Sequence, residues 1–275
     1  MKESIKESVI TSRDNLLAKR ARAVRDGRLP GLIFIEGLRL CEEALAASLL
    51  VEELFCTKRL AEDERGRRLL EEAAAAGARI NFTSEHVFAS ISDTKTPQGV
   101  AMIASRPQTG PDVLANDRAQ VPLIVVMHRI NNPSNAGAIL RAAEAAGATG
   151  AIATAGSTNL FSPRALRGAM GSAFRLPLWT GAEFRELLDW CAAHGLRTVC
   201  AVVTAARSHT EIDWTTPSAL VVGAEATGLD RAEVAAADDA VMIPMRPPVD
   251  SLNVAVASAV LLYEAARQRS ERATR

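Results

Sequence analysis

The sequence has few cysteines and few aromatic residues, no excess of charge of either sign, and no long hydrophobic run. No apolar run approaches the roughly 18 residues that a membrane helix needs, which excludes a membrane-spanning protein. The 32 basic residues balance 32 acidic residues, and this disfavours a protein that binds polyanions by bulk attraction, although steering depends on how charge is distributed. Aromatic residues make up 4% of the chain, so little material is available for a base-stacking platform.

The cysteine and histidine patterns offer no metal site. The sequence contains no C-x-x-C pair and no histidine at the spacing of a zinc ligand, so we expect four buried, reduced thiols. The first residues are charged and lack the apolar segment of a signal peptide, and we therefore expect a soluble, cytoplasmic protein. The four cysteines are Cys41, Cys56, Cys191 and Cys200.

The 275 residues, 48% of them hydrophobic, are enough for two domains or one large domain with an ample core. Proline, glycine and polar residues cluster near residue 110, and such clusters mark loops. We therefore predict a domain over 1–105, a linker over 106–120 and a second domain over 121–275.

The first half alternates between predicted helices and strands, which indicates a small α/β domain with at least partly parallel pairing. Apolar residues at helical or strand spacing predict helices over 14–26, 38–47 and 61–76 and strands over 32–35, 51–57, 79–83 and 100–104.

The first helix is rich in basic residues, with two acidic residues among them, Asp14 and Asp26. A solvated helix face explains this pattern. So does an edge that contacts nucleic-acid phosphates, where lysine and arginine gain affinity by releasing counterions. The candidate RNA-binding residues are Arg13, Lys19, Arg20, Arg22 and Arg25.

The second half repeats the α/β rhythm with more apolar strands, which predicts a mainly parallel sheet with helices on both faces. In such sheets, ligands bind at the carboxyl ends of the strands. We predict strands over 122–127, 150–154, 198–204 and 219–223 and helices over 134–146, 163–170, 182–194 and 251–268.

Three loops in this half follow predicted strands and carry polar residues. In the first, Pro133 shapes the turn, Ser134 or Asn135 is expected to cap the next helix, and Arg141 lies six residues beyond Asn135. A structural role, with asparagine as a cap and arginine on the surface, explains this segment equally well.

The second loop contains Gly223, Glu225 and Gly228. We expect Gly223 to let a ligand approach the backbone and Gly228 to adopt a positive φ. The loop is not the G-x-G-x-x-G fingerprint of dinucleotide-binding proteins, so a nucleotide-dependent oxidoreductase is rejected.

The third loop is rich in proline and leads to a predicted apolar helix through Ser251 and Asn253. Capping explains one of these two polar residues but not both. Exposed helix N-termini favour carboxylate or phosphate groups.

Together the three loops resemble the motifs of the SpoU (TrmH-like) family of RNA ribose 2′-O-methyltransferases, within the SPOUT superfamily. The matching segments are 135–141, 223–229 and 243–264, and the resemblance extends over 122–270. The segment 161–177 is also similar to the family. The N-terminal half resembles the family's substrate-binding domain through 34–37 and 96–99.

The resemblance implies a C-terminal domain with a trefoil knot and a smaller N-terminal α/β domain that binds the RNA substrate and resembles a ribosomal-protein fold. It also implies a homodimer formed through the C-terminal domain, with the final helix in the interface. S-adenosylmethionine is the implied cofactor, and no metal is needed. The implied cofactor-binding residues are Gly223, Ile243, Met245, Leu252 and Asn253.

Arg141 aligns with the arginine that the family uses to activate the ribose hydroxyl. Because arginine is locked in its protonated form, we expect it to orient the hydroxyl and to stabilise developing alkoxide, rather than to act as a simple base. The remaining implied active-site residues are Asn135, Glu225, Ser251 and Asn253.

The sequence departs from the family pattern in two places, which bear on substrate choice. The first motif is preceded by 128–133, which lacks the acidic residues of many relatives, and Ala169 replaces a frequent serine. The separate N-terminal domain favours ribosomal RNA as the substrate. The alternatives are a transfer-RNA methyltransferase and a non-catalytic RNA-binding or ribosome-assembly protein that keeps the fold.

Overall fold

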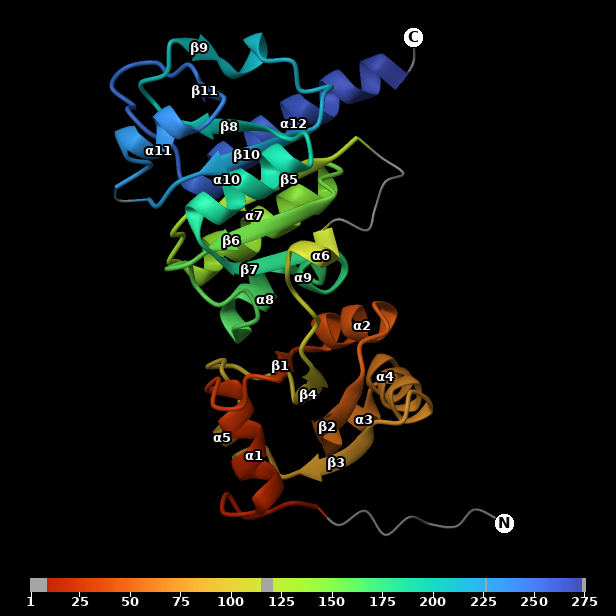
Figure 1. The fold of residues 1–275 in the computed structure, drawn as a ribbon. Helices are drawn as coiled ribbons and strands as arrows, with labels where there is room; N and C mark the ends of the chain where they lie inside the picture. Colours follow the sequence, from red (N-terminus) through yellow and green to blue (C-terminus); the bar gives the residue numbers. More distant parts are fainter. Residues whose placement is uncertain (1–8, 115–120, 226, 274–275) are drawn as a thin grey trace. The chain divides into compact units, whose positions relative to one another are not determined.

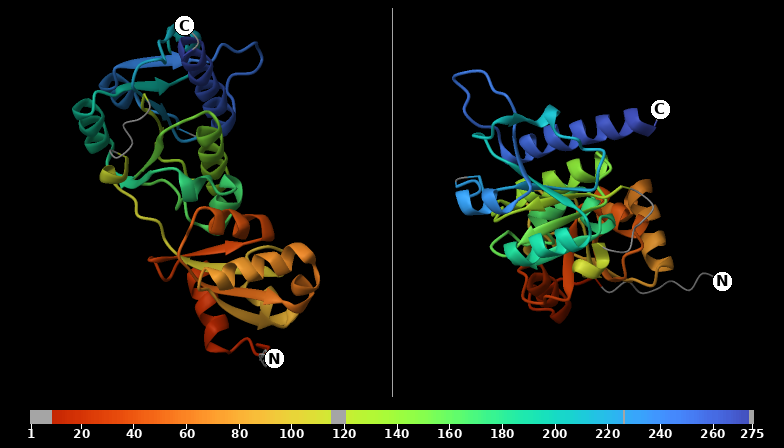
Figure 2. Two further views of the ribbon diagram at one scale, coloured as in Figure 1. Left: turned by 90° about the vertical axis from the view of Figure 1, so that its right-hand side faces the viewer. Right: turned by 45° about the horizontal axis from the view of Figure 1, so that its top comes forward.

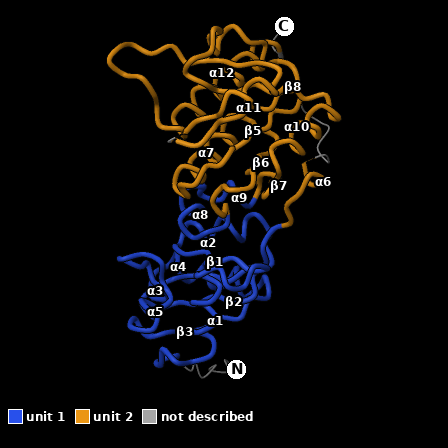
Figure 3. The backbone as a smooth tube through the Cα atoms, turned by 60° about the vertical axis from the view of Figure 1, so that its left-hand side comes forward, with its two compact units in different colours: residues 1–107, 161–174 blue, residues 108–160, 175–275 orange. Residues whose placement is uncertain are grey.

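The computed structural model describes residues 9–114, 121–225 and 227–273, and these form two compact units (Figure 3). The first unit contains the chain up to Pro107 together with Phe161–Phe174, and the second contains Gln108–Leu160 and the chain from Arg175 onward. The predicted linker over 106–120 includes the point between Pro107 and Gln108 where the chain first passes from one unit to the other. Its residues 115–120 lie outside the described residues, as does the charged segment 1–8. The domain boundaries given above stay a prediction.

The segment 161–174 belongs to the first unit, although the sequence pattern assigned it to the second half. Two contacts explain its place. Arg167 forms an ion pair with Asp93 at 2.7 Å, and the Arg106 guanidinium lies 4.7 Å from the centre of the Phe161 ring. Long-range contacts of this kind have no local signature in the sequence.

The first unit is a four-stranded sheet in the order β1-β4-β2-β3 (Figure 1). Strand β4 is antiparallel to β1 and β2, whereas β2 and β3 are parallel, as the predicted partly parallel pairing requires. The strands are β1 (Leu32–Glu36), β2 (Val51–Thr57), β3 (Arg79–Thr83) and β4 (Val100–Ser105); the helices are α1 (Leu16–Arg25), α2 (Leu38–Ala46), α3 (Lys58–Glu62), α4 (Glu64–Ala75) and α5 (Glu85–Ile91).

The helix expected over 61–76 is α4, but it begins at Glu64, because the residues before it form the separate short helix α3. The Asp63 side chain accepts a hydrogen bond from the Gly66 N–H at 3.0 Å and caps α4. A Cβ at Gly66 would lie 2.1 Å from the Leu60 carbonyl oxygen. The chain therefore turns at Asp63, and Gly66 allows the two helices to pack closely.

The second unit is a seven-stranded sheet in the order β7-β6-β5-β10-β8-β11-β9, with every neighbouring pair parallel. This confirms the predicted α/β fold with a mainly parallel sheet. The strands are β5 (Leu123–Met127), β6 (Gly150–Thr154), β7 (Leu178–Ala182), β8 (Arg197–Ala201), β9 (Arg207–Ser208), β10 (Ser218–Val222) and β11 (Asp239–Met242).

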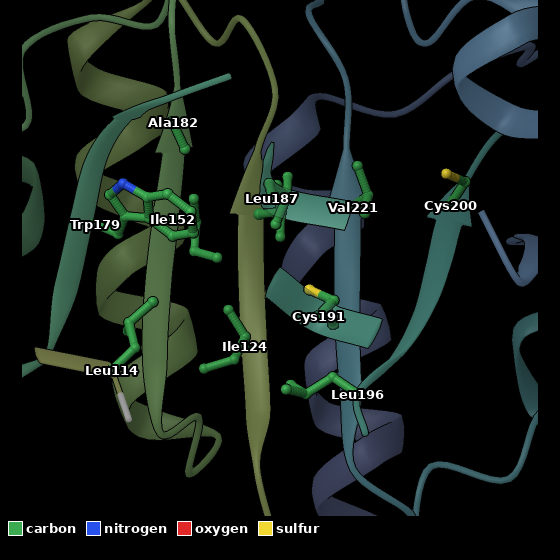
Figure 4. Close-up of a cluster of buried hydrophobic side chains, with 12 residues drawn as sticks. Leu114, Ile124, Ile152, Trp179, Ala182, Leu187, Cys191, Leu196, Cys200 and Val221 are labelled. Carbon is green, nitrogen blue, oxygen red and sulfur yellow. The ribbon is translucent and has the colours of Figure 1, made fainter. Parts of the chain in front are cut away.

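Helices cover both faces of this sheet. α7 and α12 lie side by side on one face and α10 lies on the other (Figures 1 and 2). Under α10, Leu187 and Cys191 pack on Ile124, Ile152 and Val221 of the strands (Figure 4). The helices not yet named are α6 (Pro111–Leu114), α7 (Pro133–Ala145), α8 (Pro163–Ala169), α9 (Ser172–Arg175), α10 (Phe184–Ala193), a 3-10 turn (His209–Glu211), α11 (Arg231–Ala236) and α12 (Val254–Ala273). Of these, α8 lies in the segment that belongs to the first unit.

All four cysteines are free and buried, as expected. Burial raises the pKa of the Cys191 and Cys200 thiols to about 12, so both stay protonated at neutral pH. No helix among the described residues has the length and apolar character needed to span a membrane.

Candidate active site

The loops that follow β5, β10 and β11 surround one cavity of about 990 Å³. Strands β5 and β10 are neighbours, and from them the chain continues to opposite sides of the sheet, so the cavity lies at a topological switch point. Eight of the nine residues predicted for catalysis or cofactor binding line it: Asn135, Gly223, Glu225, Ile243, Met245, Ser251, Leu252 and Asn253.

Asn135 joins the three loops. Its side-chain amide donates a hydrogen bond to the Glu225 carboxylate, and its carbonyl oxygen accepts one from Asn253 Nδ2 at 3.3 Å. The sequence suggested Ser134 or Asn135 as the cap of α7, but neither residue caps the helix. Asn132 is the cap and accepts from the Ser134 N–H at 2.9 Å. With Pro133 in the first helical position, Asn135 is free to face the neighbouring loop.

Asn253 also caps α12, because its Oδ1 accepts hydrogen bonds from the N–H groups of Ala255 (3.0 Å) and Val256 (3.4 Å). The helix expected to begin at residue 251 begins at Val254. Ser251 therefore lies before the helix, where its hydroxyl donates to the Asp250 carboxylate at 3.1 Å. Capping thus accounts for Asn253, and Ser251 is left as an exposed polar group lining the cavity.

Gly223 lines the cavity and also has a structural role that we did not expect. A Cβ at this position would lie 2.6 Å from the carbonyl carbon of Gly228 and 2.7 Å from the Leu229 nitrogen. The loop from 223 to 229 thus closes on its own backbone, and Gly223 permits that approach. Gly228 has a φ of +63°, as predicted, and its N–H donates to the Ala224 carbonyl at 2.8 Å.

Arg141 is the predicted site residue that the structure does not bring to the cavity. It lies on α7, exposed, and within the described residues it has no hydrogen bond or ion pair. Six residues of helix separate it from Asn135, which corresponds to about 120° around the helix axis and about 9 Å along it. The two side chains therefore leave the helix in different directions.

Sequence reasoning gave no role to His128, which follows β5 and is buried against Glu233 of α11. His128 Nε2 lies 2.9 Å from Glu233 Oε1, and Arg129 Nη2 lies 3.0 Å from the same oxygen. Burial lowers the pKa of His128 even though the carboxylate opposes this effect. A polar residue directly after a buried strand was the available signal, but its partner lies 105 positions away.

In the first unit, the predicted RNA-binding residues, which lie on α1 and just before it, divide into two groups. Arg20 forms ion pairs with Glu52 at 2.5 Å and with the buried Glu53 at 2.8 Å. Arg25 pairs with Asp26 at 2.8 Å. These two arginines have acidic partners within their own unit.

The positive charges of the other group are less fully neutralised by acidic side chains. Arg13 approaches a ring nitrogen of His86 at 3.4 Å, and Arg22 donates to Ser90 Oγ at 3.2 Å; neither forms an ion pair among the described residues. Lys19 pairs with Asp14 at 3.1 Å, although both side chains are largely exposed.

Comparison with known proteins identifies both halves of the chain. The model of the SpoU rRNA Methylase family matches residues 122–263. The model described as RNA 2′-O ribose methyltransferase substrate binding matches residues 34–110. The first match covers more than half of the chain.

Similar proteins agree with these matches. The chain is 32% identical to an uncharacterized tRNA/rRNA methyltransferase of Synechocystis, over 94% of each chain. It is 30% identical to the 23S rRNA guanosine 2′-O-methyltransferase RlmP of Bacillus subtilis, over 83% of this chain and 86% of the relative. An AdoMet-bound rRNA methyltransferase of Sinorhizobium meliloti superposes with a TM-score of 0.83 at 26% identity, over 94% and 97% of the two chains. The chain belongs to the SpoU rRNA methylase family.

Proposed function

We propose that this protein transfers a methyl group from S-adenosylmethionine to a ribose 2′-hydroxyl of ribosomal RNA. The observation that carries the proposal is the convergence of eight predicted site residues, from three separate loops, on one cavity. Family membership supports it, since the name of the similar Bacillus subtilis protein describes 2′-O-methylation of 23S rRNA.

The cavity fits this cofactor. Its volume is at the upper end of the range for small-molecule sites. Aliphatic side chains such as Val222, Val241 and Leu261 form part of the wall and suit an adenosine group, while Glu225 offers a carboxylate to a positively charged sulfonium. The N-terminus of α12 also lines the cavity and favours a carboxylate group.

The chemistry requires alignment more than acid–base power. S-adenosylmethionine supplies a methyl group on sulfur that is already a good leaving group. Asn135, Glu225 and Asn253 connect three loops through hydrogen bonds, and we propose that they would hold the acceptor hydroxyl and the methyl group in line. Arg141 is proposed to orient the hydroxyl and to stabilise the developing alkoxide.

Arg141 does not line the cavity of its own chain, so we propose that assembly completes the site. α12 exposes Val256, Val260 and Tyr263, which are 50%, 37% and 54% exposed and share one helical face. Burial of this face in a homodimer would remove apolar surface from water. Sedimentation of wild type and of Val260→Glu tests the dimer. The trefoil knot that the family resemblance implies stays a prediction.

The first unit is proposed to bind the RNA. The candidate contacts on α1 and just before it are unequal, because Arg13 and Arg22 have no acidic partner among the described residues whereas Arg20 and Arg25 do. Since the proposed substrate is ribosomal RNA, we also propose that the protein acts in the cytoplasm. The candidate residues are Arg13, Lys19, Arg20, Arg22 and Arg25.

Mapping of 2′-O-methylated nucleotides in total RNA from a deletion strain tests this function. We expect one ribosomal-RNA position to lose its methyl group, and to regain it when the wild-type gene is returned but not when Arg141→Ala is returned. Loss of a transfer-RNA methyl group would contradict the proposed substrate. Unchanged methylation together with a ribosome-assembly defect would favour the non-catalytic alternative.

A further inference from the structure

A buried polar contact connects the end of β5 with helix α11, outside the cavity itself. His128 is 2% exposed and Glu233 is 8% exposed, and His128 Nε2 lies 2.9 Å from Glu233 Oε1. The Phe184 ring of α10 covers the imidazole, with the ring centres 4.6 Å apart. Buried polar groups are costly unless they are paired, so this contact fixes one arrangement of the two elements.

Every polar atom of the pair has a partner. Glu233 Oε1 also accepts from Arg129 Nη2 at 3.0 Å, and Oε2 accepts from the Asp230 N–H at 2.8 Å. His128 Nδ1 lies 3.1 Å from Thr154 Oγ1, which accepts from the Arg129 N–H at 3.1 Å. A neutral imidazole that donates from Nε2 and accepts from the Thr154 hydroxyl satisfies this network.

α11 forms one wall of the cavity. Arg231, Val234 and Ala235 of this helix line it, as does Leu229 of the preceding loop. The helix has six residues, which is too short to be stable without tertiary contacts. Its position therefore depends on anchors such as Glu233.

We propose that His128 is a positioning residue for cofactor binding: its contact with Glu233 holds α11 beside the loop that leads to Asn135 and so keeps the cavity in its binding shape. The inference rests on the proposed function only for the identity of the cofactor. His128 itself does not line the cavity.

Protonation of the ring would remove the Nδ1 acceptor that faces the Thr154 hydroxyl, whereas the Nε2–H group can still donate to Glu233. The charged groups that act on His128 are Glu233, Arg129 and Asp230, and the Cys200 thiol near Glu233 stays neutral because its pKa is raised to about 12. Burial lowers the pKa of His128 and outweighs the attraction of Glu233. The network of the neutral ring is therefore complete above the ordinary histidine pKa of about 6.5, and its Nδ1 contact with Thr154 is lost as the pH falls through the lower pKa of the folded state.

Calorimetric titration of the full-length protein with S-adenosylhomocysteine tests the proposal at about pH 7.5 and at a pH below the folded-state pKa of His128. We expect wild-type affinity to fall about threefold or more on acidification, because the competent arrangement of α11 becomes less populated. His128→Gln keeps a donor but cannot titrate, so its affinity should no longer change between these pH values. Glu233→Gln should weaken binding about tenfold at the higher pH, since a charge-assisted hydrogen bond is lost.

His194→Gln is the matched control, because His194 is exposed at the end of α10 and contacts Trp190 rather than α11; it should behave as wild type. The proposal is overturned if His128→Gln keeps the wild-type pH profile, or if both variants bind as wild type at both pH values. Circular dichroism verifies folding, and if Glu233→Gln fails to fold, the pH profile of His128→Gln decides alone. Wild type that binds no S-adenosylhomocysteine at either pH would instead contradict the proposed function.

Discussion

The cavity of the second unit and helix α1 of the first unit were both singled out by sequence, yet they differ in structure. The polar residues at the cavity come from three loops and contact one another through Asn135. The basic residues of α1 are neighbours on one helix, but Arg20 and Arg25 are paired with carboxylates of their own unit. The position of a residue at a strand end was therefore a better guide to which predicted residues come together than the number of charges on a helix.

The physical reason lies in how each pattern constrains space. The carboxyl ends of neighbouring parallel strands meet at one edge of the sheet, so Asn135 meets residues 90 and 118 positions away. A run of basic residues carries no such constraint, because the acids that neutralise it can come from any element that packs nearby. Glu52 and Glu53 of β2 do so for Arg20.

Removal of the Arg141 guanidinium should have the largest effect. We expect Arg141→Ala to lower kcat for RNA methylation about a hundredfold to a thousandfold, because a group that stabilises developing charge is lost. Its affinity for S-adenosylmethionine should be unchanged, since Arg141 does not line the cavity. Filter-bound tritium and calorimetry measure the two quantities, and Arg185→Ala is the control, because Arg185 is an exposed residue of α10. Full activity of Arg141→Ala would refute the assigned role.

Gly223→Ala should disrupt the cofactor loop. The added Cβ would meet backbone atoms of Gly228 at 2.6 Å, so the loop must open; we expect cofactor affinity to fall about thirtyfold, as for a local clash of about 2 kcal/mol. Gly31→Ala is the matched control, because a Cβ there meets nothing within 4 Å. Calorimetry on both variants checks the prediction, and equal affinities would show that the loop tolerates the methyl group.

The two groups of α1 arginines should respond differently. Arg20→Ala leaves the buried Glu53 without its nearest cation, and we expect a loss of about 2 kcal/mol in unfolding free energy, measured in urea. Arg22→Ala removes no ion pair among the described residues, so stability should change little. Instead, the slope of log affinity for RNA against log salt should decrease by about one. A stability loss in Arg22→Ala together with a smaller salt slope in Arg20→Ala would contradict the distinction between the two groups.

Asn253 should give the smallest effect and separates capping from site geometry. Asn253→Ala removes the cap of α12 and should lower stability by about 1 kcal/mol. Asn253→Ser keeps a capping oxygen but is too short to hold Asn135, so stability should recover while methylation stays reduced. Thermal unfolding and methyl transfer, measured on the same preparations, check this; recovery of both together would mean that the contact with Asn135 is dispensable.

Much of this architecture could be predicted because buried strands and strand-end motifs are local patterns. The strands β1 to β4 fall where apolar runs predict them. The short strand β9 (Arg207–Ser208) carries too few residues for a pattern, and its pairing with β11 depends on the assembled sheet. The break between α3 and α4 depends on the packing of Gly66 against Leu60, which periodicity does not contain.

The sequence predicted which residues belong to the site better than it predicted how they are arranged. Motif spacing identified Glu225 and Asn253 as site residues, yet it did not show that Asn132 caps α7 or that Arg141 lies outside the cavity. The buried pair of His128 and Glu233 was missed because the two residues lie 105 positions apart in the sequence. Contacts of this kind follow only from the fold.

The central claim is most directly tested by incubating the purified protein with ribosomal RNA and S-adenosylmethionine labelled in its methyl group, followed by alkaline hydrolysis of the RNA. A ribose 2′-O-methyl group removes the hydroxyl that alkali uses to cleave the chain, so the account predicts label in alkali-stable dinucleotides, and no such label with Arg141→Ala. Label released as mononucleotides would show methylation of a base, and RNA left unlabelled by protein that binds the cofactor would contradict methyl transfer itself.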